Sequence, residues 1–139
     1  MNELTFQREL VVATKKEGGH AFKMSHRVLI GVPDLFIQLP GLPTILMECK
    51  YCHTKMPLMP TSMTPFNLSV PQLTMLNKIR GAGGKCGVCF MAKMSDQSYR
   101  VLMVRDPYAP FSLGEFLDKS FVRKHGTPWP IRAMCEELI

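Results

Sequence analysis

Apolar residues recur with helical spacing near the start of this chain. Phe6, Leu10 and Ala13 fall at i, i+4 and i+7, which predicts a helix over residues 3–17. Gly18-Gly19 follows at once and supplies the left-handed conformations that favour a helix exit. The first predicted element is therefore an amphipathic helix.

The rest of the chain alternates between strand and helix patterns. Short apolar segments predict strands at 20–24, 32–38, 44–50, 86–92 and 99–104. Further helices are predicted from Ser69 to Gly81, over 113–119 and over 131–138. Residues 51–67, rich in Met and Pro, show little periodicity and are predicted as a long loop. The order α-β-β-β-α-β-β indicates the α/β class, with a mixed β-sheet flanked by helices.

Length and composition set limits on the kind of protein. With 139 residues, the chain is long enough for one domain, with a core over about 3–105 and a C-terminal helical extension over about 106–139. No apolar run reaches the ~18 residues of a membrane span, and the first residues lack the pattern of a signal peptide. We expect an intracellular protein, cytoplasmic or nucleoid-associated, that neither binds a membrane nor uses an organic cofactor. Its size also suits a protein encoded by a virus or a mobile element.

The net charge of +6 is unevenly distributed. Residues 1–100 carry 12 Lys and Arg against 6 Asp and Glu, whereas residues 101–139 carry 5 of each. The excess positive charge lies in the larger, N-terminal part, which favours binding of a polyanion such as nucleic acid.

Two predicted strands carry candidate chemistry. Asp34 heads the strand after Gly31-Val-Pro, and Glu48-Cys-Lys50 closes the next one. Residues two apart share a face of a strand, so Glu48 and Lys50 lie together, and Asp34 joins them if the strands are neighbours. Two carboxylates suit Mg²⁺ or Mn²⁺, and the lysine can offset charge on a phosphate. This pattern points to phosphodiester chemistry.

Further motifs flank these strands, so that the order along about residues 3–92 is Glu3 and Gln7, Gly31-Val-Pro-Asp34-Leu, Met47-Glu48-Cys-Lys50, Leu68-Ser69-Val-Pro-Gln72 and Gly83-Gly84. Taken in this order, the motifs resemble the PD-(D/E)XK nuclease superfamily, most closely its small VRR-NUC nucleases and more loosely the archaeal-type Holliday junction resolvases. The resemblance implies an αβββαβ restriction-endonuclease-like core.

The resemblance also implies roles for individual residues. Asp34, Glu48, the backbone carbonyl of Cys49 and Glu3 would hold the metal, and Lys50 would assist attack by water. Gln72 would approach the site from the second helix. The likeness thus implies a metal-dependent endonuclease acting on DNA, and we expect its substrate to be branched DNA at a Holliday junction. A junction needs two symmetric cuts, so a chain of one domain is expected to act as a homodimer with two sites.

Basic and polar side chains predict a track for the DNA backbone. The candidates are Gln7, Arg8, Lys23, His26, Arg27, Lys55, Lys78 and Arg80. Such contacts position a substrate without reading its sequence, so we expect recognition of DNA shape.

Structural alternatives exist for several of these residues. In the first alternative, Glu48 and Lys50 are only an exposed ion pair on one face of the strand and take no part in a site. Glu9 is the main rival of Glu3 for the active site. Ser69 and Gln72 form a capping box, in which Gln72 reaches back to the helix start. For the whole chain, the alternatives are a nicking, flap or restriction nuclease, or a non-catalytic DNA-binding module.

The cysteines give one further alternative. Cys49-x-x-Cys52 and Cys86-x-x-Cys89 suggest a zinc site of four cysteines. The two pairs are further apart than the ~15–20 residues of most such sites, and Cys49, Cys86 and Cys89 lie on predicted strands. We therefore favour reduced core cysteines over zinc ligands.

Overall fold

The computed structural model describes residues 1–24, 29–56, 62–63, 68–107, 111–124 and 126–139, with the side chains of 53–56 and 62–63 left out. The elements are α1 (Glu3–Lys16), β1 (His20–Lys23), β2 (Leu35–Gln38), β3 (Ile45–Met56), β4 (Ser62–Met63), α2 (Val70–Gly81), β5 (Lys85–Met94), β6 (Tyr99–Val104), β7 (Phe111–Ser112), α3 (Leu113–Lys119), β8 (Phe121–Arg123) and α4 (Ile131–Glu136).

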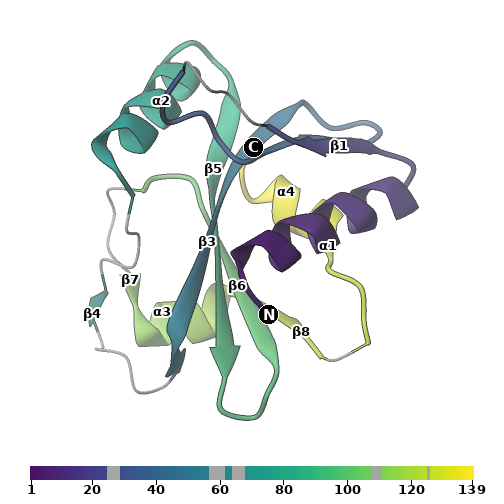
Figure 1. The fold of residues 1–139 in the computed structure, drawn as a ribbon, viewed down its shortest axis with the longest axis vertical. Helices are drawn as coiled ribbons and strands as arrows, with labels where there is room; N and C mark the ends of the chain where they lie inside the picture. Colours follow the sequence, from purple (N-terminus) through teal and green to yellow (C-terminus); the bar gives the residue numbers. More distant parts are fainter. Residues whose placement is uncertain (25–28, 57–61, 64–67, 108–110, 125) are drawn as a thin grey trace.

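The main sheet has six strands in the order β1-β2-β3-β5-β6-β8. Among the strand pairs that the structure describes, only β3 and β5 run parallel, and α2 lies in the connection between them (Figure 1). The other pairs are antiparallel. A second, small sheet pairs β4 with β7. The predicted α/β class, with a mixed sheet flanked by helices, is confirmed.

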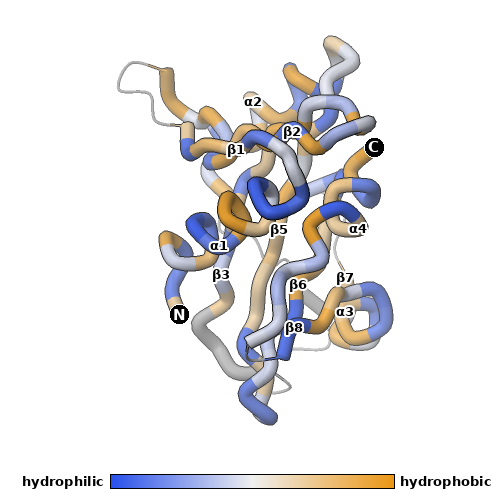
Figure 2. Tube along the Cα trace, turned by 90° about the vertical axis from the view of Figure 1, so that its right-hand side faces the viewer, coloured by the Kyte–Doolittle hydropathy of each residue, from blue (hydrophilic) through white to orange (hydrophobic). Residues whose placement is uncertain are grey.

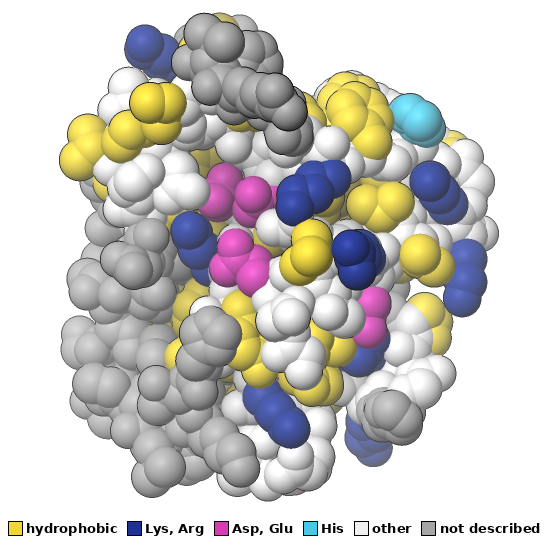
Figure 3. Space-filling view, viewed as in Figure 1, with side chains coloured by type: hydrophobic (Ala, Val, Ile, Leu, Met, Phe, Trp, Pro, Cys, Tyr) yellow, Lys and Arg dark blue, Asp and Glu magenta, His cyan; other side chains and the backbone are white. Residues whose placement is uncertain are grey.

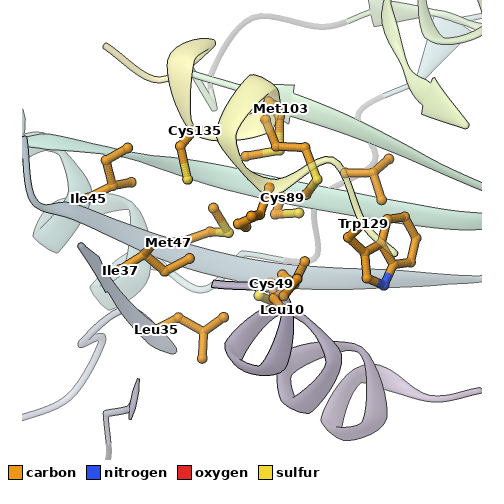
Figure 4. Close-up of a cluster of buried hydrophobic side chains, with 14 of the residues drawn as sticks. Leu10, Leu35, Ile37, Ile45, Met47, Cys49, Cys89, Met103, Trp129 and Cys135 are labelled. Atoms are coloured by element: carbon orange, nitrogen blue, oxygen red, sulfur yellow. The ribbon is translucent and has the colours of Figure 1, made fainter. Parts of the chain in front are cut away.

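Helices cover both faces of the sheet, and the parity of the strand residues decides which side chains each helix meets. Odd-numbered β2 and β3 residues, such as Leu35 and Met47, face α1 and α4 in the main core (Figure 4). On the other face, α2 packs Leu76 on Cys86 and Val88, and α3 packs Phe116 against Phe90. The tube of β5 is hydrophobic over most of its length (Figure 2), as expected for a central strand covered on both faces.

The structure corrects two predicted boundaries. The strand predicted over 32–38 begins at Leu35, so Asp34 lies just before it, where its carbonyl accepts a hydrogen bond from the Met24 N–H. The loop predicted over 51–67 is wrong in its first part, because β3 continues to Met56. Pairing with β5, as far as Met56 beside Met94, supports this extension.

The C-terminal residues contribute more than the predicted helices. Both predicted helices are present as α3 and α4. Between them lies β8, a strand that the sequence did not predict, which joins the sheet beside β6. Trp129, Ile131 and Met134 are buried in the main core. Residues far from the N-terminal motifs therefore complete the core beneath them.

Candidate active site

Asp34 is fixed by a contact across to β3. Its Oδ2 accepts a hydrogen bond of 2.9 Å from the backbone N–H of Cys49. The residue before it, Pro33, is buried, and the strand register that pairs Leu35 with Met47 brings Asp34 beside Glu48. The prediction that Asp34 and Glu48 come together is confirmed by this geometry.

Glu48 is a buried carboxylate with two polar neighbours. Its side chain is 2% exposed, and its Oε1 accepts a 2.8 Å hydrogen bond from Gln72 Nε2. The ammonium Nζ of Lys50 lies 3.7 Å from the same oxygen. Because Glu48 is buried and hydrogen-bonded to α2, its contact with Lys50 is not the exposed surface ion pair considered from the sequence.

Burial and a second carboxylate change the acidity of Glu48. Desolvation, then the charge of Asp34, raise the pKa of Glu48 from 4.5 to about 8, although the Lys50 charge opposes this. A hydrogen bond between the carboxyl groups of Asp34 and Glu48 and the charge of Glu3 act in the same direction. Two carboxyl groups sharing a proton are typical of a site that a divalent cation can occupy instead.

Gln72 makes contacts that fit both of the interpretations left open by the sequence. Its Oε1 accepts a 2.9 Å hydrogen bond from the Ser69 N–H, and the Ser69 hydroxyl accepts one from the Gln72 N–H. The capping box at the start of α2 is thus confirmed. Since its Nε2 simultaneously donates to Glu48, the cap fixes the side chain that orients the buried carboxylate.

Gly31 explains how α2 comes so close to the site. Its backbone has φ +87°, and a Cβ at this position would lie 2.4 Å from the Pro71 carbonyl oxygen. Only glycine allows both the left-handed conformation and this contact. The glycine of the Gly31-Val-Pro-Asp34 motif therefore brings the chain before Asp34 against the first turn of α2.

α1 approaches the site through its N-terminal turn. Glu3 is close enough to raise the pKa of Glu48, and Gln7 lies one turn further on the same side of the helix. Gln7 is buried, and its Oε1 has no hydrogen-bond partner among the described residues. Gln7 is thus a poor candidate for contacting a DNA backbone.

The donor set fits a hard divalent cation. Asp34 and Glu48 supply the carboxylates, and Cys49, whose backbone carbonyl is a predicted ligand, directly follows Glu48 and donates its N–H to Asp34. Burial first, and the Asp34 charge second, raise the pKa of Glu48, and a bound cation would offset the repulsion between the two carboxylates. Within the described residues, no group of three or more His, Cys, Asp and Glu side chains has metal-holding geometry. The predicted position of Glu3 as a direct ligand therefore stays a prediction.

The predicted DNA-binding residues are not all near the carboxylates. Lys23 is exposed at the end of β1, and Lys78 is exposed on α2. Arg8 lines a pocket of about 560 Å³ on the side of α1 away from Glu3. Arg80 lies in the last turn of α2. His26 and Arg27, and the side chain of Lys55, lie outside the described residues.

One face of the molecule combines the two kinds of charge. Figure 3 shows Asp and Glu side chains gathered near the centre of this face, with Lys and Arg side chains around them. Such a distribution can hold a cation at the centre and phosphates at the edges.

The cysteines do not converge as a zinc site would require. The parallel register sets Cys49 beside Cys89, but Cys86 beside Leu46 and Cys52 beside Ala92. Burial raises the pKa values of the Cys49 and Cys89 thiols well above the ordinary value of a cysteine. These two residues are part of the hydrophobic core.

Sequence reasoning missed a polar network behind α1. Glu9 forms an ion pair with Arg123 of β8, and its Oε2 accepts a 2.7 Å hydrogen bond from Trp129 Nε1. Glu9, the sequence rival of Glu3, therefore ties α1 to the C-terminal segment. No local pattern could reveal a contact between residues this far apart in the chain.

The comparisons with known proteins give little beyond this geometry. No family model matches the chain, and no curated protein matches it. Among solved structures, the chain is similar to Hjc, a Holliday junction resolvase from Archaeoglobus fulgidus, with 20% sequence identity, a TM-score of 0.45, and coverage of 88% of this chain and 84% of that one. The resemblance to VRR-NUC nucleases stays a prediction. No helix in the described ranges is long and apolar enough to cross a membrane.

Proposed function

We propose that this chain is a Mg²⁺-dependent endodeoxyribonuclease, with Mn²⁺ as a substitute, which cleaves branched DNA and resolves Holliday junctions. The observation that carries the proposal is the convergence of Asp34, Glu48 and Lys50, with Glu48 buried and held by Gln72. The order of sequence motifs through these residues supports the same reaction.

Each residue has a distinct task in this proposal. Asp34 and Glu48 hold the cation, and their backbone and side-chain hydrogen bonds fix the direction of each carboxylate before substrate arrives. The bound cation supplies Lewis acidity toward the phosphate and lowers the pKa of water. Lys50, whose side chain is 18% exposed, stays accessible and offsets negative charge that develops on the phosphate.

DNA is the proposed polymer because the positive charge lies with the site. The excess of Lys and Arg is confined to residues 1–100, which also provide all the proposed site residues. A junction requires two symmetric cuts, so we propose that a homodimer presents two such sites.

A cleavage assay with four DNA substrates tests the proposal. Wild-type protein should cut a four-way junction faster than flap, nicked or linear duplexes with Mg²⁺, and should bind without cutting when Ca²⁺ replaces it. Lys50→Ala should lower the rate by about 10²- to 10³-fold. Lys93→Ala is the matched control, since Lys93 is also half-buried but lies on β5 opposite Tyr99.

The outcomes separate the alternatives. Faster cutting of linear duplex would replace the resolvase with a restriction-type nuclease. DNA binding without cutting under any divalent cation would leave a non-catalytic module. Equal activity of Lys50→Ala and Lys93→Ala would remove Lys50 from the mechanism.

A further inference from the structure

Aromatic side chains that are wholly or partly exposed lie on the first two strands of the sheet. His20 and Phe22 of β1 and Phe36 of β2 share one face, because the register pairs Phe22 with Phe36. The two phenyl rings are stacked, with centroids 4.7 Å apart and planes 13° from parallel. The His20 ring lies 5.6 Å from that of Phe22. We call these three residues the aromatic platform.

The aromatic platform is on the same sheet face as the buried carboxylate. Phe36 pairs with Leu46 of β3, and Glu48 follows Leu46 by two residues, which returns it to the same face. Phe36 itself lies two residues after Asp34, a distance of roughly 7 Å along an extended chain. The platform and the proposed cleavage site are therefore neighbours on one surface.

The outer ring of the aromatic platform is open to solvent on one side. Phe22 is 44% exposed on an edge strand, whereas Ala21, which faces α1, is 2% exposed. A cross-strand aromatic pair stabilises a sheet, and this accounts for the contact between the rings. The contact with Phe36 leaves the other side of the Phe22 ring free to meet a further planar group.

We propose that the aromatic platform stacks with an unpaired base of the DNA strand whose phosphate lies at Asp34 and Glu48. Aromatic faces accept any base, since every base has a π-face. Charge complementarity favours a nucleic acid here, since Lys and Arg side chains lie between the acidic centre and the hydrophobic and histidine side chains on this face (Figure 3).

This inference rests on the proposed function and deepens it. A base that stacks on Phe22 has left its own helical stack, so intact linear duplex must first lose base stacking. Branch points, flaps and single strands already offer unstacked bases. The platform would thus select DNA with a disrupted helix near the cut, without reading its sequence.

The experiment measures binding and stacking separately from cleavage. A single strand and a four-way junction, each with the fluorescent base 2-aminopurine at successive positions, are added to wild type, Phe22→Ala and Phe22→Trp in EDTA. Wild type should quench one position. Phe22→Ala should remove that quenching and weaken single-strand and junction binding roughly 5- to 150-fold. Phe22→Trp should restore both.

Val122→Ala is the matched control. Val122 is 45% exposed on β8, the opposite edge strand of the same sheet, and should bind DNA as wild type does. Binding to intact linear duplex should be the same for all four proteins. Thermal melting of each variant shows that it is folded, and Phe22→Trp keeps the test decisive if Phe22→Ala does not fold.

Three results would overturn the inference. The first is unchanged quenching in Phe22→Ala, and the second is an equal loss of affinity for linear duplex and single strand. The third is dissociation of a dimer by Phe22→Ala, because the platform would then be a contact between protein chains. The binding assay contains no metal, so it is independent of cleavage. If the wild type never cuts DNA, but Phe22→Ala removes the quenching that the wild type shows, the proposed nuclease function fails and the base-stacking inference stands.

Discussion

The raised pKa of Glu48 predicts that the metal-free protein loses stability as the pH rises. In the folded protein this pKa is about 8, against 4.5 for the ordinary group. Between these values the folded protein keeps a proton that the unfolded chain has released, so folding is favoured by protons. The stabilisation is complete below about pH 4.5, falls steadily through the window, and is gone above about pH 8.

The expected magnitude follows from the two pKa values. The difference between 4.5 and about 8, at about 1.4 kcal/mol per pH unit, corresponds to roughly 5 kcal/mol. Glu48 is 2% exposed, so solvent screening reduces this value little. The whole free energy of unfolding of a small domain is about 5–15 kcal/mol. The carboxylate pair therefore lowers the stability by a large fraction of that value near neutral pH unless a cation binds it.

Urea denaturation near pH 5 and near pH 9, with EDTA and with Mg²⁺, measures this effect. In EDTA, wild type should be several kcal/mol less stable at the higher pH, and Glu48→Gln should lose most of that difference, since an amide cannot ionise. Mg²⁺ should stabilise wild type mainly at high pH, where it does not compete with the proton.

Glu137→Gln controls for general effects of charge, because Glu137 is an exposed acid at the end of α4 and should follow wild type. If wild type and Glu48→Gln lose stability in parallel between the two pH values, the proton is not on Glu48, and the argument for a cation at this carboxylate pair fails with it.

Two further predictions concern the contacts between α2 and the site. Ser69→Ala should lower the free energy of unfolding by about 1 kcal/mol, because the helix loses its cap. Gln72→Ala should lower it by a further ~1–3 kcal/mol and reduce cleavage, because it also leaves Glu48 without its hydrogen-bond donor. Equal activity of the two variants in a junction assay would show that Gln72 serves only to cap the helix. In urea denaturation, Gly31→Ala should destabilise the protein by more than about 2 kcal/mol, because the new Cβ meets the Pro71 carbonyl oxygen. Gly41 has a similar φ of +79° but no atom within 4 Å of its Cβ position, so Gly41→Ala should cost about 1 kcal/mol. Equal costs would show that backbone strain alone determines the effect.

Local patterns were sufficient for the parts of the site that are local. The capping box depends on Ser69 and Gln72 alone, and it could be predicted from their spacing. The meeting of Asp34 and Glu48 depended only on two strands joined by a short turn. These features lie within short stretches of chain whose geometry is nearly fixed by their residues.

Other features depend on contacts that no local pattern encodes. β3 extends past Lys50 because β5 pairs with it, and the sequence over 51–56 has no strand signal of its own. Glu9 finds Trp129 from the other end of the chain. Burial of Glu48 also required the position of α2, which a strand pattern cannot supply. The sequence therefore predicted which residues meet at the site better than it predicted their environment.

The single parallel pair at the centre of the sheet has a consequence for how the protein folds. β1, β2 and β3 form an antiparallel meander whose contacts are close in sequence, so we expect it to form early. The β3–β5 pair joins Ile45 to Lys85 and must close a much longer loop, which α2 crosses. Gln72 reaches Glu48 only when that loop closes. Completion of the site and the late, entropically costly step of folding are thus expected to be one event, so the hydrogen bond between Gln72 and Glu48 should form only at the end of refolding.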